Sequence, residues 1–196
     1  MKQENILHIF SHMPVLETDR LLLRPMRVSD AQDMYEYASN PDVTRYLLWR
    51  PHDTPSYTRS YLEYLGGRYR LAPCREWAVI LKSEGRMIGT SGFAAIDCPN
   101  RVGELGYVLN PAYRGQGFSP EAARRVISFG FDVLGLHRIE ARYMIGNDAS
   151  RRVMEKIGMR YEGVRRESML VKGAYRDIGI CAILVSEYRA AKAQGE

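Results

Sequence analysis

A glycine-rich turn between a strand and a helix constrains this chain more than any other feature. The turn reads Tyr113-Arg114-Gly115-Gln116-Gly117-Phe118-Ser119-Pro120; a strand-like run over 103–109 precedes it, and an amphipathic helix pattern over 120–134 follows. The first N–H groups of a helix have no partner within the helix, and the helix dipole puts partial positive charge there. Gly115 and Gly117 lack a Cβ, so an anion can approach the backbone closely. The turn therefore predicts a site for a phosphate-bearing ligand, to which Arg114 adds a full charge.

Two common phosphate-binding motifs do not fit this turn. No Lys followed by Ser or Thr closes it, as a P-loop requires, and Pro120 stands where a dinucleotide motif needs its third Gly. Pro120 instead suits the first position of the helix. The remaining pattern, from Arg114 to Ser119, resembles the Q/R-x-x-G-x-G/A loop with which GNAT N-acetyltransferases hold the pyrophosphate of acetyl-CoA. Ser119 departs from that pattern but is small. An ordinary strand-to-helix turn is the alternative.

Length and composition indicate one globular domain. The chain has 196 residues, of which 45% are hydrophobic, enough for a sizeable core. We expect an N-terminal extension over 1–15 without regular structure, a single domain over 16–188 and a C-terminal tail over 189–196. No apolar run approaches the ~18 residues that span a membrane, and none suits a secretory signal. The 3 cysteines contain no C-x-x-C pair, which indicates neither disulfides nor zinc. These features favour a reducing cytoplasm.

The charge of the chain limits its partners. A net charge of +5 suits an anionic cofactor or a ribosome-associated substrate. The arginines are scattered and form only short pairs, which is typical of a solvated surface rather than of a nucleic-acid site. The histidines have no metal-ligand spacing, so we expect no metal. Monomer and homodimer both stay open.

The N-terminal part of the domain carries a second motif. Residues 20–25 predict a strand, and the capping box from Ser29 to Gln32 predicts a helix over 30–39. This start resembles the T-x-R-L-x-L-R-P-x-x-x-x-D-A opening of the RimJ/RimL-type ribosomal-protein N-acetyltransferases. The matching residues are Thr18, Arg20, Leu21, Leu23, Arg24, Pro25, Asp30 and Ala31.

A second helix is predicted after Thr54, a good N-cap residue that precedes Pro55, and runs to about Tyr69. In the family that the chain resembles, this segment lies beside the acceptor. Its apolar positions either face that acceptor or form a buried stripe, and we favour the stripe for most of Tyr57, Tyr61, Tyr64 and Leu65.

The remaining elements define the fold class. Residues 76–81 and 86–96 predict a hairpin, and 101–109 a third antiparallel strand. The strand predicted over 139–145 follows the helix closely, so it must run parallel to 101–109 through a right-handed crossover. Asn147 caps a helix over 148–157, and strands over 160–165 and 174–188 end the pattern. This order resembles the GNAT fold, which implies a mixed α+β structure: a mostly antiparallel central sheet with one splayed parallel strand pair and helices on both faces.

The resemblance assigns the strand before the turn to catalysis. In the family, this strand diverges from its parallel neighbour, and the pantetheine arm of acetyl-CoA enters the gap. The matching residues Tyr107, Val108 and Leu109 would pair with pantetheine amides, and one N–H would face the thioester oxygen. Such a preorganised donor contributes on the order of 3 kcal/mol to barrier lowering.

Three polar residues are candidates for the remaining chemistry. An α-amino group has a pKa near ~8 and a lysine near ~10, so the acceptor must lose a proton. Glu104, on the same strand, is the candidate general base; an exposed or ion-paired role is the alternative. The resemblance implies that Asn147 binds pantetheine besides capping its helix, and that Ser150 donates a proton to the leaving thiolate. Cys181 replaces a tyrosine common in the family, so that tyrosine's role is not transferred.

The resemblance implies direct acetyl transfer from acetyl-CoA to a primary amine, with the N-terminal α-amino group of a ribosomal protein favoured. A polyamine, aminoglycoside or amino acid is an alternative acceptor, because acceptor choice depends on residues 41–70 and the last hairpin. Two further alternatives are an acyl-CoA-binding sensor without turnover and a basic RNA-associated module. The presence of Glu104 and Ser150 disfavours the sensor, and the scattered basic residues disfavour the module.

Overall fold

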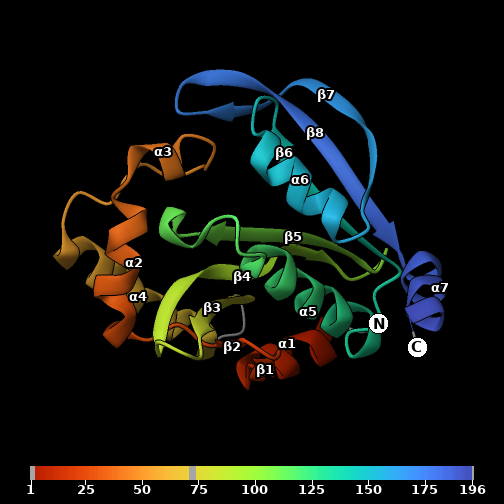
Figure 1. The fold of residues 1–196 in the computed structure, drawn as a ribbon, viewed down its shortest axis with the longest axis horizontal. Coiled ribbons are helices and arrows are strands. Elements are labelled where there is room, and N and C mark those ends of the chain that lie inside the picture. Colours follow the sequence, from red (N-terminus) through yellow and green to blue (C-terminus); the bar gives the residue numbers. More distant parts are fainter. Residues whose placement is uncertain (1–2, 71–73, 196) are drawn as a thin grey trace.

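A single mixed sheet forms the centre of the molecule. The computed structural model describes residues 3–70 and 74–195. Within them the sheet has the strand order β1-β2-β3-β4-β5-β6-β8-β7 (Figure 1). The strands are β1 (Leu16–Glu17), β2 (Leu21–Arg24), β3 (Glu76–Leu81), β4 (Arg86–Asp97), β5 (Val102–Leu109), β6 (Arg138–Met144), β7 (Arg160–Val171) and β8 (Ala174–Leu184).

Helices surround this sheet. They are α1 (Gln3–Ser11), α2 (Ala31–Ala38), α3 (Pro41–Thr44), α4 (Pro55–Arg70), α5 (Phe118–Asp132), α6 (Asp148–Lys156) and α7 (Val185–Gly195), with single 3₁₀ turns at Val28–Asp30 and Pro111–Tyr113. Trp77 of β3 joins α1 and α5 to the sheet, since its ring lies 5.9 Å from that of Phe10 and 5.5 Å from that of Phe129. The order of the predicted strands and helices and the mixed α+β class are confirmed.

The parallel pair diverges along its length. β5 and β6 are in register from Val102 and Arg138 to Leu105 and Ala141, and no register pair follows. β5 nevertheless continues to Leu109, paired on its other side with β4. The last residues of β5 therefore have no strand partner on the β6 side, and the predicted splayed gap is confirmed.

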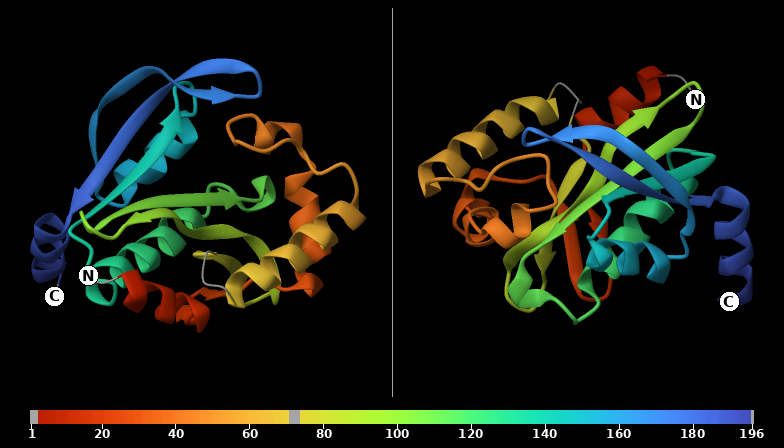
Figure 2. Two further views of the ribbon diagram at one scale, coloured as in Figure 1. Left: turned by 180° about the vertical axis from the view of Figure 1, so that it is seen from behind. Right: turned by 90° about the horizontal axis from the view of Figure 1, so that it is seen from above.

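The β7–β8 hairpin lies at the end of the sheet, and its tip bends toward α3 (Figures 1 and 2). Lys172, in its tip, donates a hydrogen bond of 2.6 Å from Nζ to the carbonyl of Thr44 at the end of α3. β7 is longer than the predicted strand, which ended at Arg165. The reason is that residues Met169 to Val171 resume pairing with β8 after an irregular stretch.

Two predictions at the ends of the chain were wrong. The start was expected to be irregular, but α1 forms, and its Ile6 and Phe10 are buried in the core. These residues lie four positions apart and so share one helix face. The final strand was predicted to reach Tyr188, yet β8 ends at Leu184, where the Glu187 carboxylate accepts the Leu184 N–H at 2.9 Å. The first turn of α7 is thereby capped, and the chain continues as a helix.

The predicted capping box at Ser29 was also wrong. The Asp30 carboxylate accepts the N–H of Arg27 at 2.8 Å and forms a bidentate pair with Arg24 at 2.7 and 2.8 Å. The side chain of Asp30 is almost fully buried, so this ion pair connects β2 to the start of α2, and loss of one partner would leave the other charge buried. The pair is called the anchor of α2 below.

On α4 the expected N-cap is present, since Thr54 Oγ1 accepts the N–H of Tyr57 at 3.1 Å. The buried stripe was misassigned in part. Leu65 is buried, but Tyr57 and Tyr64 are more than half exposed. The stripe consists instead of Thr58, Leu62, Leu65 and Tyr69.

Candidate active site

The glycine-rich turn has the backbone that its sequence predicts. Gly115 and Gly117 have φ angles of 79° and 82°, which lie in the left-handed region that favours glycine. Gly117 is the N-cap of α5, with no side chain capping it. One prediction was wrong here: because α5 begins at Phe118, Pro120 occupies the third helical position rather than the first. Its missing N–H is tolerated there too, since the first N–H groups of a helix lack intrahelical partners.

The N–H groups of the turn are free to bind an anion. Among the described residues, no N–H from Gly115 to Ser119 donates a hydrogen bond, whereas Glu121 N–H donates to Gly117 O. Arg20 braces the turn: its guanidinium donates to Gln116 O at 3.0 Å and to the Glu121 carboxylate at 2.7 Å. Free N–H groups at a helix N-terminus, beside two glycines and the Arg114 side chain, fit a diphosphate.

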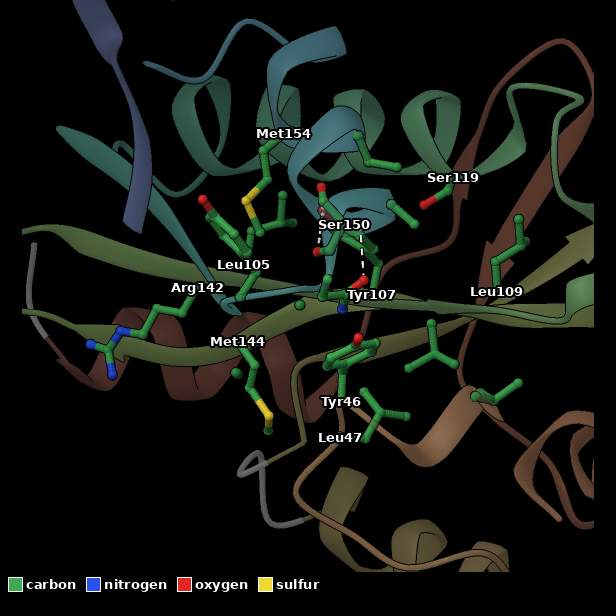
Figure 3. A pocket seen from close by; sticks show the side chains of 18 of the residues that line it. Tyr46, Leu47, Leu105, Tyr107, Leu109, Ser119, Arg142, Met144, Ser150 and Met154 are labelled. Carbon is green, nitrogen blue, oxygen red and sulfur yellow. Dashed lines mark hydrogen bonds between the residues drawn. The ribbon is translucent and has the colours of Figure 1, made fainter. Parts of the chain in front are cut away.

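A cavity of about 690 Å³ begins at this turn and passes through the gap beside β5. Figure 3 shows side chains on both sides of β5, with Ser150, Met154 and Ser119 on one side and Tyr46, Leu47 and Met144 on the other. The first side holds residues of α5 and α6. The second side faces α3 and the tip of the β7–β8 hairpin. The two sides suit a cofactor and an acceptor that meet at β5.

Main-chain groups of β5 face the gap at alternate residues. Asn110 N–H donates to Ile88 O at 2.8 Å, so the main chain of Asn110 points toward β4. Alternation along a strand directs Val108 toward β4 as well, and Tyr107 and Leu109 toward the gap. Tyr107 and Leu109 thus present the predicted main-chain donors and acceptors, while Val108 lines the cavity through its side chain.

Ser150 is positioned by hydrogen bonds to residues of two different elements. Its N–H donates to Asn147 Oδ1 at 3.3 Å, which confirms Asn147 as the cap of α6. Its Oγ lies 3.1 Å from Tyr107 Oη, and Tyr107 also donates to Ser150 O at 2.9 Å (Figure 3). Burial raises the pKa of Tyr107, so its hydroxyl stays protonated. A hydroxyl pair thereby spans the gap between β5 and α6.

Glu104 lies on the opposite face of β5 from Tyr107, because the two are three positions apart along the strand. Its carboxylate is 3.4 Å from Arg142 of β6, with 24% of its side chain exposed. Burial raises the pKa of Glu104, while Arg142 lowers it and Glu140 raises it, with a net upward shift. A carboxylate with a raised pKa is a better proton acceptor than an exposed one.

The cavity gathers nearly all the predicted residues. Gln116 lies outside it, and the other predicted residues line it: Glu104, Tyr107, Val108, Leu109, Arg114, Gly115, Gly117, Phe118, Ser119, Asn147 and Ser150. Phe118 and Ser119 are largely buried and pack the turn. Several lining residues carried no sequence signal, among them Tyr46, Glu76, Arg142 and Met169. Each reaches the cavity from a separate element, so only the fold assembles them.

Comparison with known proteins identifies this arrangement. A family model described as an acetyltransferase (GNAT) domain matches residues 20–160. The chain is 33% identical over 176 residues to the uncharacterized N-acetyltransferase p20 of Bacillus licheniformis, covering 90% of this chain and 99% of that protein. A GNAT-family acetyltransferase from Bacillus anthracis aligns with a TM-score of 0.78 and 32% identity, over 88% of this chain and 99% of that structure. The chain belongs to the GNAT acetyltransferase family, whose N-acetyltransferases use acetyl-CoA.

Other relatives differ in their acceptors. The ribosomal-protein-S5-alanine acetyltransferase of Vibrio fischeri aligns with a TM-score of 0.71 and 26% identity, over 87% of this chain and 96% of that structure. The spermidine N(1)-acetyltransferase of Vibrio cholerae is 23% identical over 169 residues, covering 86% of this chain and 95% of that protein.

Within the described residues, no group of three potential metal ligands occurs, and none of the helices has the length and apolar character of a membrane span.

Proposed function

We propose that this enzyme transfers the acetyl group of acetyl-CoA directly to the N-terminal α-amino group of a ribosomal protein. The observation that carries the transfer is the gap beside β5, where unpaired main-chain groups, a carboxylate and a hydroxyl pair border one cavity. The opening motif from Thr18 to Ala31 and the likeness to the Vibrio fischeri enzyme support the acceptor.

Glu104 accepts the proton of the acceptor ammonium, directly or through water. It lies on the face of β5 that also carries Val108, away from the Ser150 side where the cofactor arm enters. Its raised pKa makes its carboxylate more basic than that of an exposed glutamate. The acceptor therefore reaches the gap from the α3 side and meets the thioester across β5.

The hydroxyl of Ser150 donates a proton to the departing thiolate. Tyr107 Oη lies 3.1 Å from Ser150 Oγ and holds that hydroxyl in the gap. A thiol has a pKa of about 8.5, so the thiolate leaves moderately well unaided and the donor adds a modest gain. The N–H groups of Tyr107 and Leu109 face the gap, and one of them stabilises the charge that develops on the thioester oxygen.

A polyamine is the second candidate acceptor. The acceptor side of the cavity is lined by Asp42, Glu76 and Glu104, and Arg142 is held in ion pairs with Glu104 and Glu140. This lining favours cations, and the spermidine acetyltransferase of Vibrio cholerae is a relative.

The experiment compares ribosomal proteins from cells with and without the gene by mass spectrometry. Loss of one N-terminal acetyl group in the deletion strain, restored by purified enzyme and acetyl-CoA, is the expected result. An unchanged ribosomal pattern together with rapid acetylation of polyamines would replace the protein acceptor with the second candidate. A chain that binds acetyl-CoA but acetylates no amine would be a sensor rather than an enzyme.

A further inference from the structure

A second carboxylate lines the same side of the cavity as Glu104. This side, which faces α3 and the tip of the β7–β8 hairpin, is called the acceptor chamber below. Glu76, the first residue of β3, is in register with Gly92 of β4, and Gly92 is in register with Gly106 of β5. Register partners point to the same face of a sheet, and so do residues two apart along one strand. Glu76 therefore lies on the same face as Gly106 and Glu104, and both carboxylates line the one cavity.

The surface of the sheet between the two carboxylates carries no bulky side chain. Gly92 and Gly106 have no side chains, and a Cβ on Gly106 would meet only the methyl group of Ala94, at 3.9 Å. Strands are spaced ~4.8 Å apart and rise ~3.3 Å per residue, so the Cα atoms of Glu76 and Glu104 lie roughly 12 Å apart. An extended ligand can lie across β4 between these two side chains.

The surroundings of Glu76 differ from those of Glu104. Glu104 has Arg142 as an ion-pair partner, whereas the Glu76 carboxylate has no hydrogen bond or ion pair among the side chains that the structure describes. Burial raises the pKa of Glu76. Its charge also contributes to the raised pKa values of Tyr61, which lines the cavity, and of Tyr37.

Tyr37 adds an independent observation. Its side chain is 1% exposed, and its hydroxyl has no hydrogen-bond partner among the described residues. A carboxylate and a nearby hydroxyl that both lack partners among the described residues are unfavourable, and a cation bound to the carboxylate beside the ring of Tyr61 would relieve part of that cost.

We propose that Glu76 determines specificity by binding a second cationic group of the acceptor, roughly 8–12 Å from the reacting nitrogen. The inference rests on the proposed function and narrows its acceptor to a dication. Two sources supply that chemistry: an α,ω-diamine, or a peptide whose second residue is basic. Glu104 receives the proton of the reacting amine, and Glu76 holds the other charge at the far end of the chamber.

The test compares acceptors that differ only in the second charge. Purified enzyme and acetyl-CoA are assayed with diaminooctane against octylamine, and with a peptide bearing Lys at its second position against the same peptide bearing norleucine. We expect wild-type kcat/KM to favour the dication of at least one pair by about tenfold, chiefly through KM. In Glu76→Gln that preference falls toward unity. The pair that shows the effect identifies the source.

A control variant shows whether a loss of the preference for dications is specific to Glu76. Glu63 lies exposed on α4, outside the cavity, and Glu63→Gln should keep the full preference. Thermal unfolding and acetyl-CoA titration of both variants verify that the fold and the cofactor site are intact. Equal rates for both members of each pair, or a preference that survives Glu76→Gln, would overturn the inference while leaving the transferase proposal in place. No turnover with any amine would instead overturn the proposed function, and this inference with it.

Discussion

Replacing Arg142 by methionine should shift the pH dependence of the reaction. The substitution keeps most of the apolar stem of the side chain and removes the charge that lies 3.4 Å from the Glu104 carboxylate. Glu104 must be deprotonated to act as a base, so turnover falls as the pH drops through its pKa. Arg142 lowers that pKa. Without the guanidinium the pKa rises, and the acid limb of the profile moves to higher pH.

The expected size of this shift follows from the distance between the charges. Two unit charges at 3.4 Å interact by about 1.2 kcal/mol at the dielectric constant of water and by about 5 kcal/mol at an effective value of ~20. The two side chains are 24% and 33% exposed, so solvent screens the pair and the lower part of this range applies. One pKa unit corresponds to about 1.4 kcal/mol, so we expect a shift of about one pH unit.

The assay is kcat against pH with acetyl-CoA and one amine both saturating. The titration of the amine is common to all variants, so a difference between profiles reports the enzyme. Arg142→Lys, which restores a positive charge, should return the limb most of the way toward its wild-type position. Glu104→Gln should remove the part of the limb that differs between wild type and Arg142→Met, and reduce kcat by about 100-fold or more. An acid limb that stays in place in Arg142→Met, or a near-normal kcat with an unchanged profile in Glu104→Gln, would refute the assignment of the base.

Three further predictions concern the cofactor turn, the hydroxyl pair and the anchor of α2. Gly117→Ala places a Cβ at a φ of 82°, so we expect about 1 kcal/mol of strain and weaker binding of acetyl-CoA in calorimetry. Unchanged binding would show that the turn is not the cofactor site. Ser150→Ala should lower kcat by about tenfold with little change in the KM for acetyl-CoA, and Tyr107→Phe should lower it less; equal rates in both variants and wild type would exclude the proton donor. Asp30→Ala leaves Arg24 buried without its partner, so denaturant unfolding should report a loss of about 3–5 kcal/mol, and a loss below 1 kcal/mol would show that the pair is not an anchor.

The elements that could be predicted from the sequence are those specified by neighbouring residues. Gly115 and Gly117 permit a left-handed backbone, Asn147 caps the helix that follows it, and alternation marks β5 and β6. A strand, a helix and a strand with short connections leave one topology, so the parallel pair followed from local patterns. The resemblance of residues 114–119 to a known loop then identified the cofactor.

Predictions failed where a local pattern allowed more than one partner. The sequence around Ser29 is compatible with a capping box, but the Asp30 carboxylate instead binds the N–H of Arg27 and the side chain of Arg24, which only the packing of β2 against α2 brings near. The exposure of Tyr57 and Tyr64 likewise depends on which face of α4 meets the core.

The sequence by itself determined the order of elements and the glycine-rich turn, because each is specified within a few residues by backbone sterics, capping and periodicity. The class of chemistry followed from the resemblance of two short motifs to a known family. The tertiary structure alone decided which side chains meet in the acceptor chamber. Tyr107 reaches Ser150 43 positions later in the chain, Arg142 reaches Glu104 from the next strand, and Glu76 arrives from two strands away. Such contacts depend on register and strand order, which arise from burying the whole sheet at once and leave no mark in any short stretch of sequence.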